Sequence, residues 1–255
     1  MLKSVNVSTI ASAWLFEYNL ALTLSFYFEG STLVKKRAVT RQSLPDVIAA
    51  DLRSRILSGD LAEGDLIRQE LLAAEYDVSR MPVREALKRL DSEGLVVFTT
   101  NKGATVTKHS LEEIAEIFDL RVLLEVDLFS KSIPRMTEQD FEACQALLDK
   151  MEASYAAGNV AEWGPLNAEF HGLLYAAANQ SLTMQLLERI SMQANRYVSM
   201  HIDQLRKADN AENEHRALLS FAKDRNIEVA TSLLTKHLID TKQQLIELIA
   251  KTRDS

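Results

Sequence analysis

Three histidines in the second half of the chain are candidate metal ligands. Asn167 and His171 lie four residues apart in LNAEFHGLLYAAAN, so on a helix their side chains share one face. His215 lies in ENEHRALLSFA and His237 in LLTKHLIDTKQQL. Apolar neighbours at helical spacing predict that each ring points inward. Three imidazoles meeting in one bundle would suit a Zn²⁺-like ion, whereas three separately satisfied histidines would leave the same pattern.

Basic side chains mark a second place for chemistry. Arg80, Arg84 and Lys88 recur every four residues and form a ridge along one face of a predicted helix. Such a ridge at the start of a helix can enter the major groove, where arginine binds guanine edges or phosphates. Ser79 and the first backbone N–H groups of the helix can hold a phosphate. A solvated basic face is the alternative, because Glu85 shares the helix.

Residues 43–107 predict the elements that position this ridge. Ser43 caps a first helix with Pro45 in its first turn. A second helix over about 68–75 is expected to bury Leu71, Leu72, Ala74 or their neighbours. A third helix runs from the Ser79 cap to about residue 92, and Gly94 ends it. LVVF and ATV then flank an Asn-Lys-Gly turn, which predicts a hairpin. The arrangement is a winged helix-turn-helix.

Residues 108–255 read as an all-helical bundle. Ser110 and Glu113 form a capping box before an apolar pattern of helical period. Further helices are predicted at about 137–157, 160–177, 180–206, 209–224 and 226–250. Bundles of this kind build ligand sites from inward-facing polar groups. The expected fold class is mainly α.

Composition limits the function classes. Of 255 residues only 8 are Gly and 4 are Pro, which excludes a disordered or fibrous chain. The net charge of −7 argues against nucleic-acid binding, but residues 1–107 carry 13 basic and 13 acidic residues, so the acidic surplus lies in the second half. The single cysteine, Cys144, excludes a disulfide scaffold and fits a cytoplasmic protein. Within EACQALLDKM we expect it to lie on an ordinary helix rather than to act as a nucleophile.

The first forty-two residues differ from the rest. The stretch 5–28 is mostly apolar but contains Glu17, whose charge is costly in a membrane. It lacks a clean signal-peptide cleavage site. We expect an extension that is poorly ordered or precedes the true start, rather than a membrane anchor.

Residues 44–107, with VSRMPVREALKRLDSEGLV at their centre, resemble the DNA-binding domain of GntR-family transcription regulators. The resemblance implies DNA contacts from Ser79, Arg80, Met81 and Arg84, and from Lys102 and Gly103 at the wing tip. Met81 stands where the family often has Thr. Asp77 replaces the usual turn glycine, which a left-handed aspartate tolerates. Where the family often has an arginine this chain has Glu70, and Arg68 is the expected substitute.

The second half resembles the FCD effector domain of the FadR subfamily. Its metal-binding form carries Asp or Asn, then His four residues later, then two further histidines, and Asn167, His171, His215 and His237 match in order. Asn167 replaces the commoner Asp, which removes one negative charge and should weaken metal binding. Arg121 matches an arginine of the family's first effector helix, and Arg196 is a second candidate. A metal beside an arginine suits a small carboxylate. For Arg121 an ion pair with Glu125 is the alternative role.

The combined expectation is a ligand-responsive transcription regulator, by family resemblance a repressor, that binds a pseudo-palindromic operator as a homodimer. Its bundle would hold a divalent metal, Zn or alternatively Ni, and a small carboxylate. The alternative is an enzyme whose three-histidine metal activates water. Glu169 and Glu214 are the available acids or bases beside the ligands, and both are expected to point away, so we predict a regulator.

Overall fold

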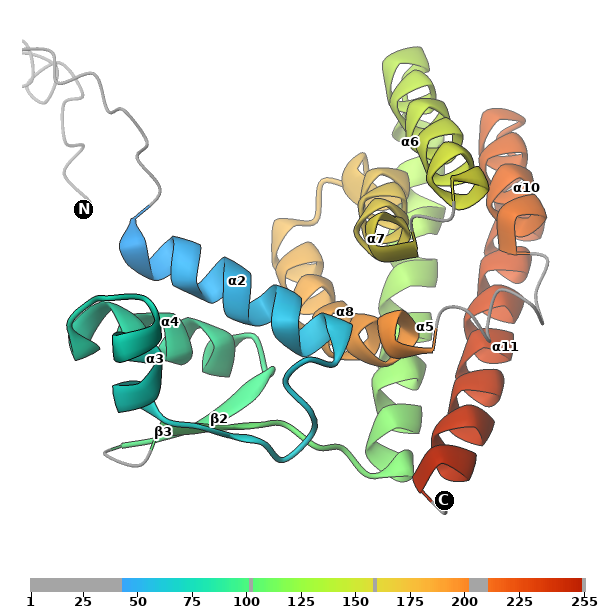
Figure 1. Ribbon diagram of the computed structural model, residues 1–255. Coiled ribbons are helices and arrows are strands. Elements are labelled where there is room, and N and C mark those ends of the chain that lie inside the picture. Colours follow the sequence, from blue (N-terminus) through green and yellow to red (C-terminus); the bar gives the residue numbers. More distant parts are fainter. Residues whose placement is uncertain (1–42, 101–102, 158–159, 202–210, 254–255) are drawn as a thin grey trace, which may run out of the picture. The chain divides into compact units, whose positions relative to one another are not determined.

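The computed structural model describes residues 43–100, 103–157, 160–201 and 211–253, so the predicted extension 1–42 lies outside the described residues. Helices dominate and one small antiparallel sheet accompanies them, which confirms the mainly α fold class (Figure 1). The elements in chain order are α2 (Leu44–Ser58), β1 (Leu66–Ile67), α3 (Gln69–Glu75), α4 (Arg80–Ser92), β2 (Val96–Thr99), β3 (Gly103–Val106), α5 (Leu111–Ser132), η2 (Ile133–Arg135), α6 (Glu138–Ala156), α7 (Val160–Ala176), α8 (Ser181–Met200), α10 (Ala211–Lys223) and α11 (Ile227–Arg253).

Helices α2 and α4 pack on each other and form most of the first hydrophobic core. Helix α2 begins as predicted, with Ser43 at its N-cap, Pro45 in its first turn and the Asp46 carboxylate accepting from the Ser43 N–H at 3.0 Å. Each helix buries an apolar stripe, formed by apolar residues three or four positions apart: Ile48, Leu52 and Ile56 on α2, and Val83, Ala86, Leu87 and Leu90 on α4. The stripes therefore leave the opposite face of α4 to the solvent.

The short helix α3 differs in part from its prediction. Leu72 is buried as expected, but its second core residue is Ala73, whereas Leu71 is 64% exposed. Over only two turns the apolar residues do not define which face is inward, and packing against α4 decides it. Asp77 has φ +52°, which confirms the left-handed turn between α3 and α4.

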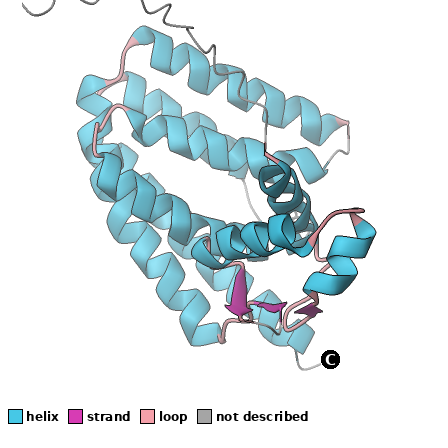
Figure 2. Cartoon of the chain, turned by 90° about the vertical axis from the view of Figure 1, so that its left-hand side faces the viewer, coloured by secondary structure: helices cyan, strands magenta, loops and turns pink. Residues whose placement is uncertain are grey.

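The predicted hairpin forms as β2 and β3, and β1 pairs with the other side of β3, so the strand order is β1-β3-β2 (Figure 2). Strand β1 was not predicted, because two residues are too few to show an alternating pattern. Gly103 has φ +108°, and a Cβ at this position would lie 2.2 Å from the Ile67 carbonyl oxygen. The close approach of β1 therefore requires glycine here, whatever else Gly103 does.

The helices from α5 to α11 enclose a second core. Helix α5 contacts α7, α8 and α11, and α6 contacts α7 and α10. The predicted capping box at the start of α5 is present. Ser110 accepts from the Glu113 N–H at 3.1 Å, and the Glu113 carboxylate accepts from the Ser110 N–H at 2.7 Å. The helix predicted over 180–206 ends at Met200, and residues 202–210 are outside the described part.

Cys144 lies on helix α6, as predicted, and its side chain is buried in this core with no exposed surface. Burial raises the pKa of its thiol to about 12. Because only the thiolate reacts, we expect the folded chain at pH 8 to resist an aromatic disulfide reagent, and the urea-unfolded chain to react at one thiol per chain. Rapid labelling of the folded chain, followed by absorbance, would show that Cys144 is accessible and reactive.

No helix within the described ranges is both long and apolar enough to span a membrane.

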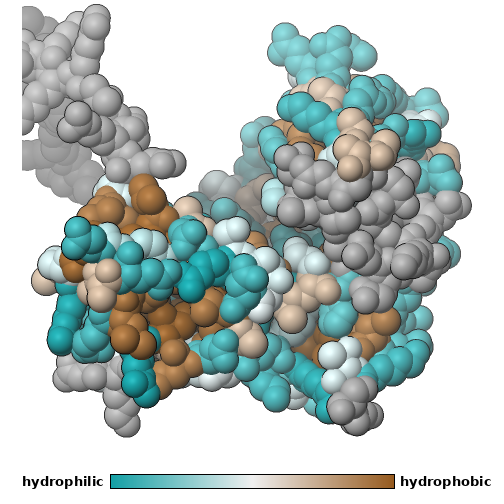
Figure 3. All heavy atoms as spheres, in the orientation of Figure 1, coloured by the Kyte–Doolittle hydropathy of each residue, from teal (hydrophilic) through white to brown (hydrophobic). Residues whose placement is uncertain are grey.

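Figure 3 shows hydrophobic side chains at the surface of the α2–α4 region, interspersed with hydrophilic ones. The exposed apolar residues of this region include Leu44, Val47, Leu71 and Met81.

Candidate functional site

Three helices bring the predicted histidines together inside the bundle. His171 of α7, His215 of α10 and His237 of α11 are all buried, and one ring nitrogen of each lies within 4.8 Å of the others. Their ring centroids are 5.0–5.7 Å apart. The three rings are therefore mutual neighbours rather than dispersed through the bundle, as one shared site requires.

A chain of buried polar groups extends from His171. Its Nδ1 is 3.0 Å from the Tyr175 hydroxyl, which donates to Glu125 Oε2 at 2.6 Å. Glu125 Oε1 accepts from Arg121 Nε at 2.6 Å, and Glu125 is only 1% exposed. Arg121 thus reaches the histidine cluster as an ion-pair partner of Glu125, the alternative role considered for it. Tyr175 was missed, although it continues the four-residue spacing of Asn167 and His171.

Glu214 contacts His237 directly. Its Oε2 lies 2.7 Å from His237 Nδ1, so the expectation that this side chain points away was wrong. The hydrogen bond from His237 lowers the pKa of the Glu214 carboxyl. Glu214 precedes His215 on α10, but α11 crosses α10 so that His237 reaches it from the neighbouring helix. Glu169, the other acid considered, is exposed.

His215 and Asn167 have buried polar atoms without a hydrogen-bond partner among the described residues. Neither Nδ1 nor Nε2 of His215 has a hydrogen-bond partner within the described part of the chain, and the same holds for Asn167 Oδ1. Buried polar atoms are normally paired. Burial and the neighbouring His237 hold the pKa of His215 well below its ordinary value. His171 has a lowered pKa through burial, the two other histidines and Arg121. Neutral imidazoles with free lone pairs fit a divalent metal ion.

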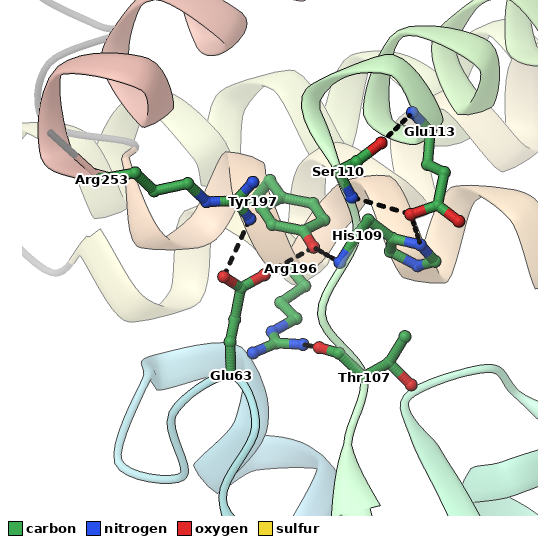
Figure 4. A network of polar contacts seen from close by, with 8 residues as sticks. All are labelled: Glu63, Thr107, His109, Ser110, Glu113, Arg196, Tyr197 and Arg253. Carbon is green, nitrogen blue, oxygen red and sulfur yellow. Dashed lines mark hydrogen bonds and ion pairs between the residues drawn. The ribbon is translucent and has the colours of Figure 1, made fainter.

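Arg196, the second candidate effector arginine, has its contacts elsewhere. It is 2% exposed on α8, and its guanidinium donates to the Thr107 carbonyl oxygen in the segment that joins β3 to α5 (Figure 4). Burial lowers its pKa. His109 is half-buried here, with its ring 6.2 Å from that of Tyr197. These residues form the junction between the winged-helix region and the bundle.

Glu63, in the loop after α2, is the acceptor at the centre of this junction. Its Oε1 accepts from the Tyr197 hydroxyl at 2.7 Å and its Oε2 from Arg253 at 2.9 Å (Figure 4). The Tyr197 oxygen also accepts from the His109 N–H at 3.2 Å. Helices α8 and α11 thus both contact one carboxylate of the winged-helix region, and α11 is the helix that carries His237.

Tyr197→Phe should loosen this junction. The change deletes one buried hydroxyl and leaves the Glu63 carboxylate without one of its donors, so we expect the free energy of unfolding to fall by about 1–3 kcal/mol. Urea unfolding followed by circular dichroism measures the loss. Tyr76→Phe, which removes a hydroxyl bonded to Asp51 at 2.5 Å on an exposed surface, is the matched control and should cost less. Equal stabilities of Tyr197→Phe and the parent chain would show that the junction bond is energetically irrelevant.

The face of α4 opposite its core carries the basic ridge. The side chains predicted to contact DNA that lie in or beside α3 and α4 are exposed: Arg68, Ser79, Arg80, Met81, Arg84 and Lys88. Arg80 pairs with Glu70 of α3 at 3.0 Å. Gly103 begins β3, whereas Lys102 lies outside the described residues. The exposed start of α4, capped by Ser79, presents its N-terminal N–H groups to the solvent beside these cations.

Comparisons with known proteins agree with this arrangement. Residues 44–106 match the family model of bacterial regulatory proteins of the gntR family, and residues 116–240 match the FCD domain. The HTH-type transcriptional regulator BphR of Paraburkholderia xenovorans is 30% identical over 204 residues, which cover 77% of this chain and 83% of that protein. The HTH-type transcriptional repressor GlaR of Escherichia coli is 29% identical over 196 residues, covering 74% of this chain and 89% of the repressor.

Solved structures show the same fold. E. coli McbR/YncC aligns with a TM-score of 0.69 at 22% identity, over 84% of this chain and all of that one. A GntR-family transcriptional regulator from Pseudomonas syringae pv. tomato aligns with a TM-score of 0.52 at 30% identity, over 83% and 88%. These relatives are regulators, so the metalloenzyme alternative has no support among them. The chain belongs to the GntR family of bacterial transcriptional regulators and carries that family's helix-turn-helix together with an FCD domain.

Proposed function

We propose that this regulator is a repressor whose bundle binds a small carboxylate effector beside a divalent metal ion. The observation that carries the proposal is the buried cluster of three histidines, in which both ring nitrogens of His215 lack a partner among the described residues. Nitrogen ligands of this kind suit Zn²⁺ first and Ni²⁺ as an alternative. Asn167, His171, His215 and His237 would hold the ion.

A metal held by these residues would supply a Lewis-acid position for one effector carboxylate oxygen. Arg121 is the arginine that we assign to the effector, in preference to Arg196, because its charge acts on His171 whereas Arg196 donates to the junction. Glu125 takes the Nε hydrogen of Arg121, and a guanidinium has further N–H groups to offer a carboxylate. Binding of the effector would therefore be sensed by α5, which carries Arg121, and through the metal by α7, α10 and α11, which carry the histidines.

The winged-helix region, residues 43–107, would dock α4 in the major groove and the hairpin wing in the minor groove. Arg80, Arg84 and Lys88 supply the cations, with Ser79 and Met81 at the helix start. One such helix reads only a half-site, so we propose a homodimer on a pseudo-palindromic operator. Residues 108–255 would then serve effector binding and dimerisation, and sedimentation at micromolar concentration should give twice the chain mass of 28.6 kDa.

The junction offers a route from effector to operator. Helix α11 carries His237 and ends at Arg253, which contacts Glu63 of the winged-helix region. An effector that shifts α11 or α8 would change how Glu63 is held, and so favour one placement of the DNA-binding helices. Operator affinity then changes by the difference in contacts between the two states.

The proposal is tested on the full chain stripped of metal. Zn²⁺, and then acetate, lactate, succinate and citrate with and without Zn²⁺, are screened by thermal shift. The same additions are made to complexes with a duplex selected by the protein from a random pool. We expect Zn²⁺ to raise the melting temperature and at least one carboxylate to weaken operator binding only when Zn²⁺ is present. A melting temperature that does not change when Zn²⁺ is added would refute the metal centre.

A further inference from the structure

Two of the three histidines have one ring nitrogen engaged by a polar partner. We infer that Tyr175 and Glu214 are positioning residues, which hold His171 and His237 as Nδ1–H tautomers and so leave each Nε2 lone pair free for the metal. The inference rests on the proposed metal-binding function and deepens it. On this inference, the hydrogen bonds to Tyr175 and Glu214 make two neutral histidines ready to bind a metal ion.

For His171 the direction of the hydrogen bonds follows from the chain of acceptors. Glu125 accepts from Arg121 Nε at 2.6 Å and from the Tyr175 hydroxyl at 2.6 Å. The single hydroxyl hydrogen of Tyr175 is thus used, and its oxygen can only accept from His171 Nδ1, 3.0 Å away. A neutral imidazole with hydrogen on Nδ1 carries its lone pair on Nε2, the atom left for a metal.

For His237 the argument has one step. Glu214 Oε2 lies 2.7 Å from Nδ1, and an ionised carboxylate accepts but does not donate. Nδ1 of His237 therefore carries the hydrogen, and Nε2 is again free. Histidine ligands in metal sites are commonly oriented by a carboxylate in this way, which also makes the ring a stronger donor.

The third ring is positioned by packing instead. The His215 ring lies 5.2 Å from that of Phe170 and 6.2 Å from that of Trp163, both on α7. Neither of its nitrogens has a partner within the described ranges, so no hydrogen bond from that part of the chain selects its tautomer. Aromatic contacts thus orient His215, whereas hydrogen bonds orient the other two rings.

Glu214 also supplies the negative charge that Asn167 does not. The charge of Glu125 is balanced by the buried Arg121 at 2.6 Å. Apart from His237, the cation beside Glu214 among the described residues is Lys236 at 3.6 Å, whose side chain is 63% exposed and therefore well screened by water. The carboxylate behind His237 is thus the charge that stabilises a divalent ion among four neutral ligands.

The tautomers are measured first, in metal-free full-length protein labelled with ¹⁵N-histidine. Long-range ¹H–¹⁵N correlation spectra distinguish a protonated from an unprotonated ring nitrogen. We expect His171 and His237 to be protonated at Nδ1, and Tyr175→Phe to change the His171 pattern while His237 keeps its own. Protonation of either ring at Nε2 in the parent protein would overturn the inference. This readout does not depend on whether the protein binds a metal.

Zn²⁺ affinity is measured next, by competition with a chelating dye. Tyr175→Phe and Glu214→Ala should each raise the Kd by about 10- to 100-fold, the usual effect of removing such a partner. Glu214→Gln keeps an acceptor but no charge and should fall between the parent and Glu214→Ala. The controls are Tyr76→Phe, which deletes a hydroxyl far from the cluster in sequence, and Glu169→Gln, which neutralises an exposed carboxylate on α7. Both should bind Zn²⁺ as the parent does.

The outcomes separate the inference from the proposed function. Parent-like Zn²⁺ affinity in both Tyr175→Phe and Glu214→Ala overturns the positioning roles while leaving the metal centre intact. A parent protein that binds no Zn²⁺ refutes the metal centre, and the spectra of the metal-free protein then still decide the tautomers. Equal losses in Glu214→Ala and Glu214→Gln support a role through charge, whereas a parent-like Glu214→Gln supports orientation alone and refutes the charge argument.

Discussion

Arg84→Ala is expected to weaken operator binding by about 1–3 kcal/mol, roughly 5- to 150-fold, without unfolding the chain. Arg84 is exposed on the outer face of α4, and no ion pair engages it within the described part of the protein. Its guanidinium is thus available to a guanine edge or a phosphate, whereas neighbouring Arg80 already pairs with Glu70. Fluorescence anisotropy with a labelled, selected duplex measures the effect at fixed ionic strength.

Arg89→Ala provides the matched control. It removes the same charge from the same helix, but Arg89 pairs with Asp46 of α2. If the ridge of Arg80, Arg84 and Lys88 is the DNA-binding face, Arg89→Ala should reduce affinity much less than Arg84→Ala. Equal losses would mean that only net charge matters, and an unchanged Kd for Arg84→Ala would refute the ridge. The dependence of Kd on salt distinguishes the contact type, since loss of a phosphate contact lowers the slope by about one.

His215→Ala is expected to abolish stabilisation by metal. A ligand that binds only the folded state at 100 times its Kd adds about 2.7 kcal/mol to the free energy of unfolding. For a chain of this size that is a rise in melting temperature of roughly 5–11 °C. His215 contributes a buried ring at the centre of the cluster, 5.0 Å from His237 and 5.2 Å from His171. Its loss leaves two imidazoles, too few for a tight site.

The quantity to measure is the difference in melting temperature with and without Zn²⁺. The cavity left by the ring lowers both values, so the absolute melting temperature does not report on the metal. His201→Ala is the control, because His201 follows α8 and lies outside the histidine cluster. It should keep the full response to Zn²⁺. A His215→Ala protein that still gains several degrees from Zn²⁺ would show that the ion binds elsewhere.

Local patterns predicted much of the fold. The helices begin at the predicted N-cap residues Ser43, Ser79 and Ser110, and α2 and α4 each bury an apolar stripe. These features depend on residues within one or two turns of each other, so the sequence alone predicts them. The errors occur where local information is short. Leu71 was assigned to the core because seven residues of α3 do not determine a face, and the two-residue strand β1 exists only by pairing with β3.

The candidate site shows the same division. Asn167 and His171 share a face because helical periodicity places residues four apart together, and the same rule extends to Tyr175. That Glu214 would turn to His237, 23 residues later, follows from how α11 packs on α10. Arg196 belongs to the junction because the segment that contains Thr107 packs against α8, where Thr107 accepts a hydrogen bond from Arg196. The periodicity within one helix does not encode which residues of another helix it will contact.

Local sequence patterns were enough to predict most of the helices, their apolar faces, the basic side chains at the start of α4 and the histidines that are candidate metal ligands. Three features come from tertiary packing alone: the rings from α7, α10 and α11 meet, Tyr175 of α7 donates to Glu125 of α5, and Glu63 accepts from both Tyr197 and Arg253. The physical reason is range. Capping and helical periodicity act within a turn or two, whereas burial and ion pairing depend on which distant segments pack together.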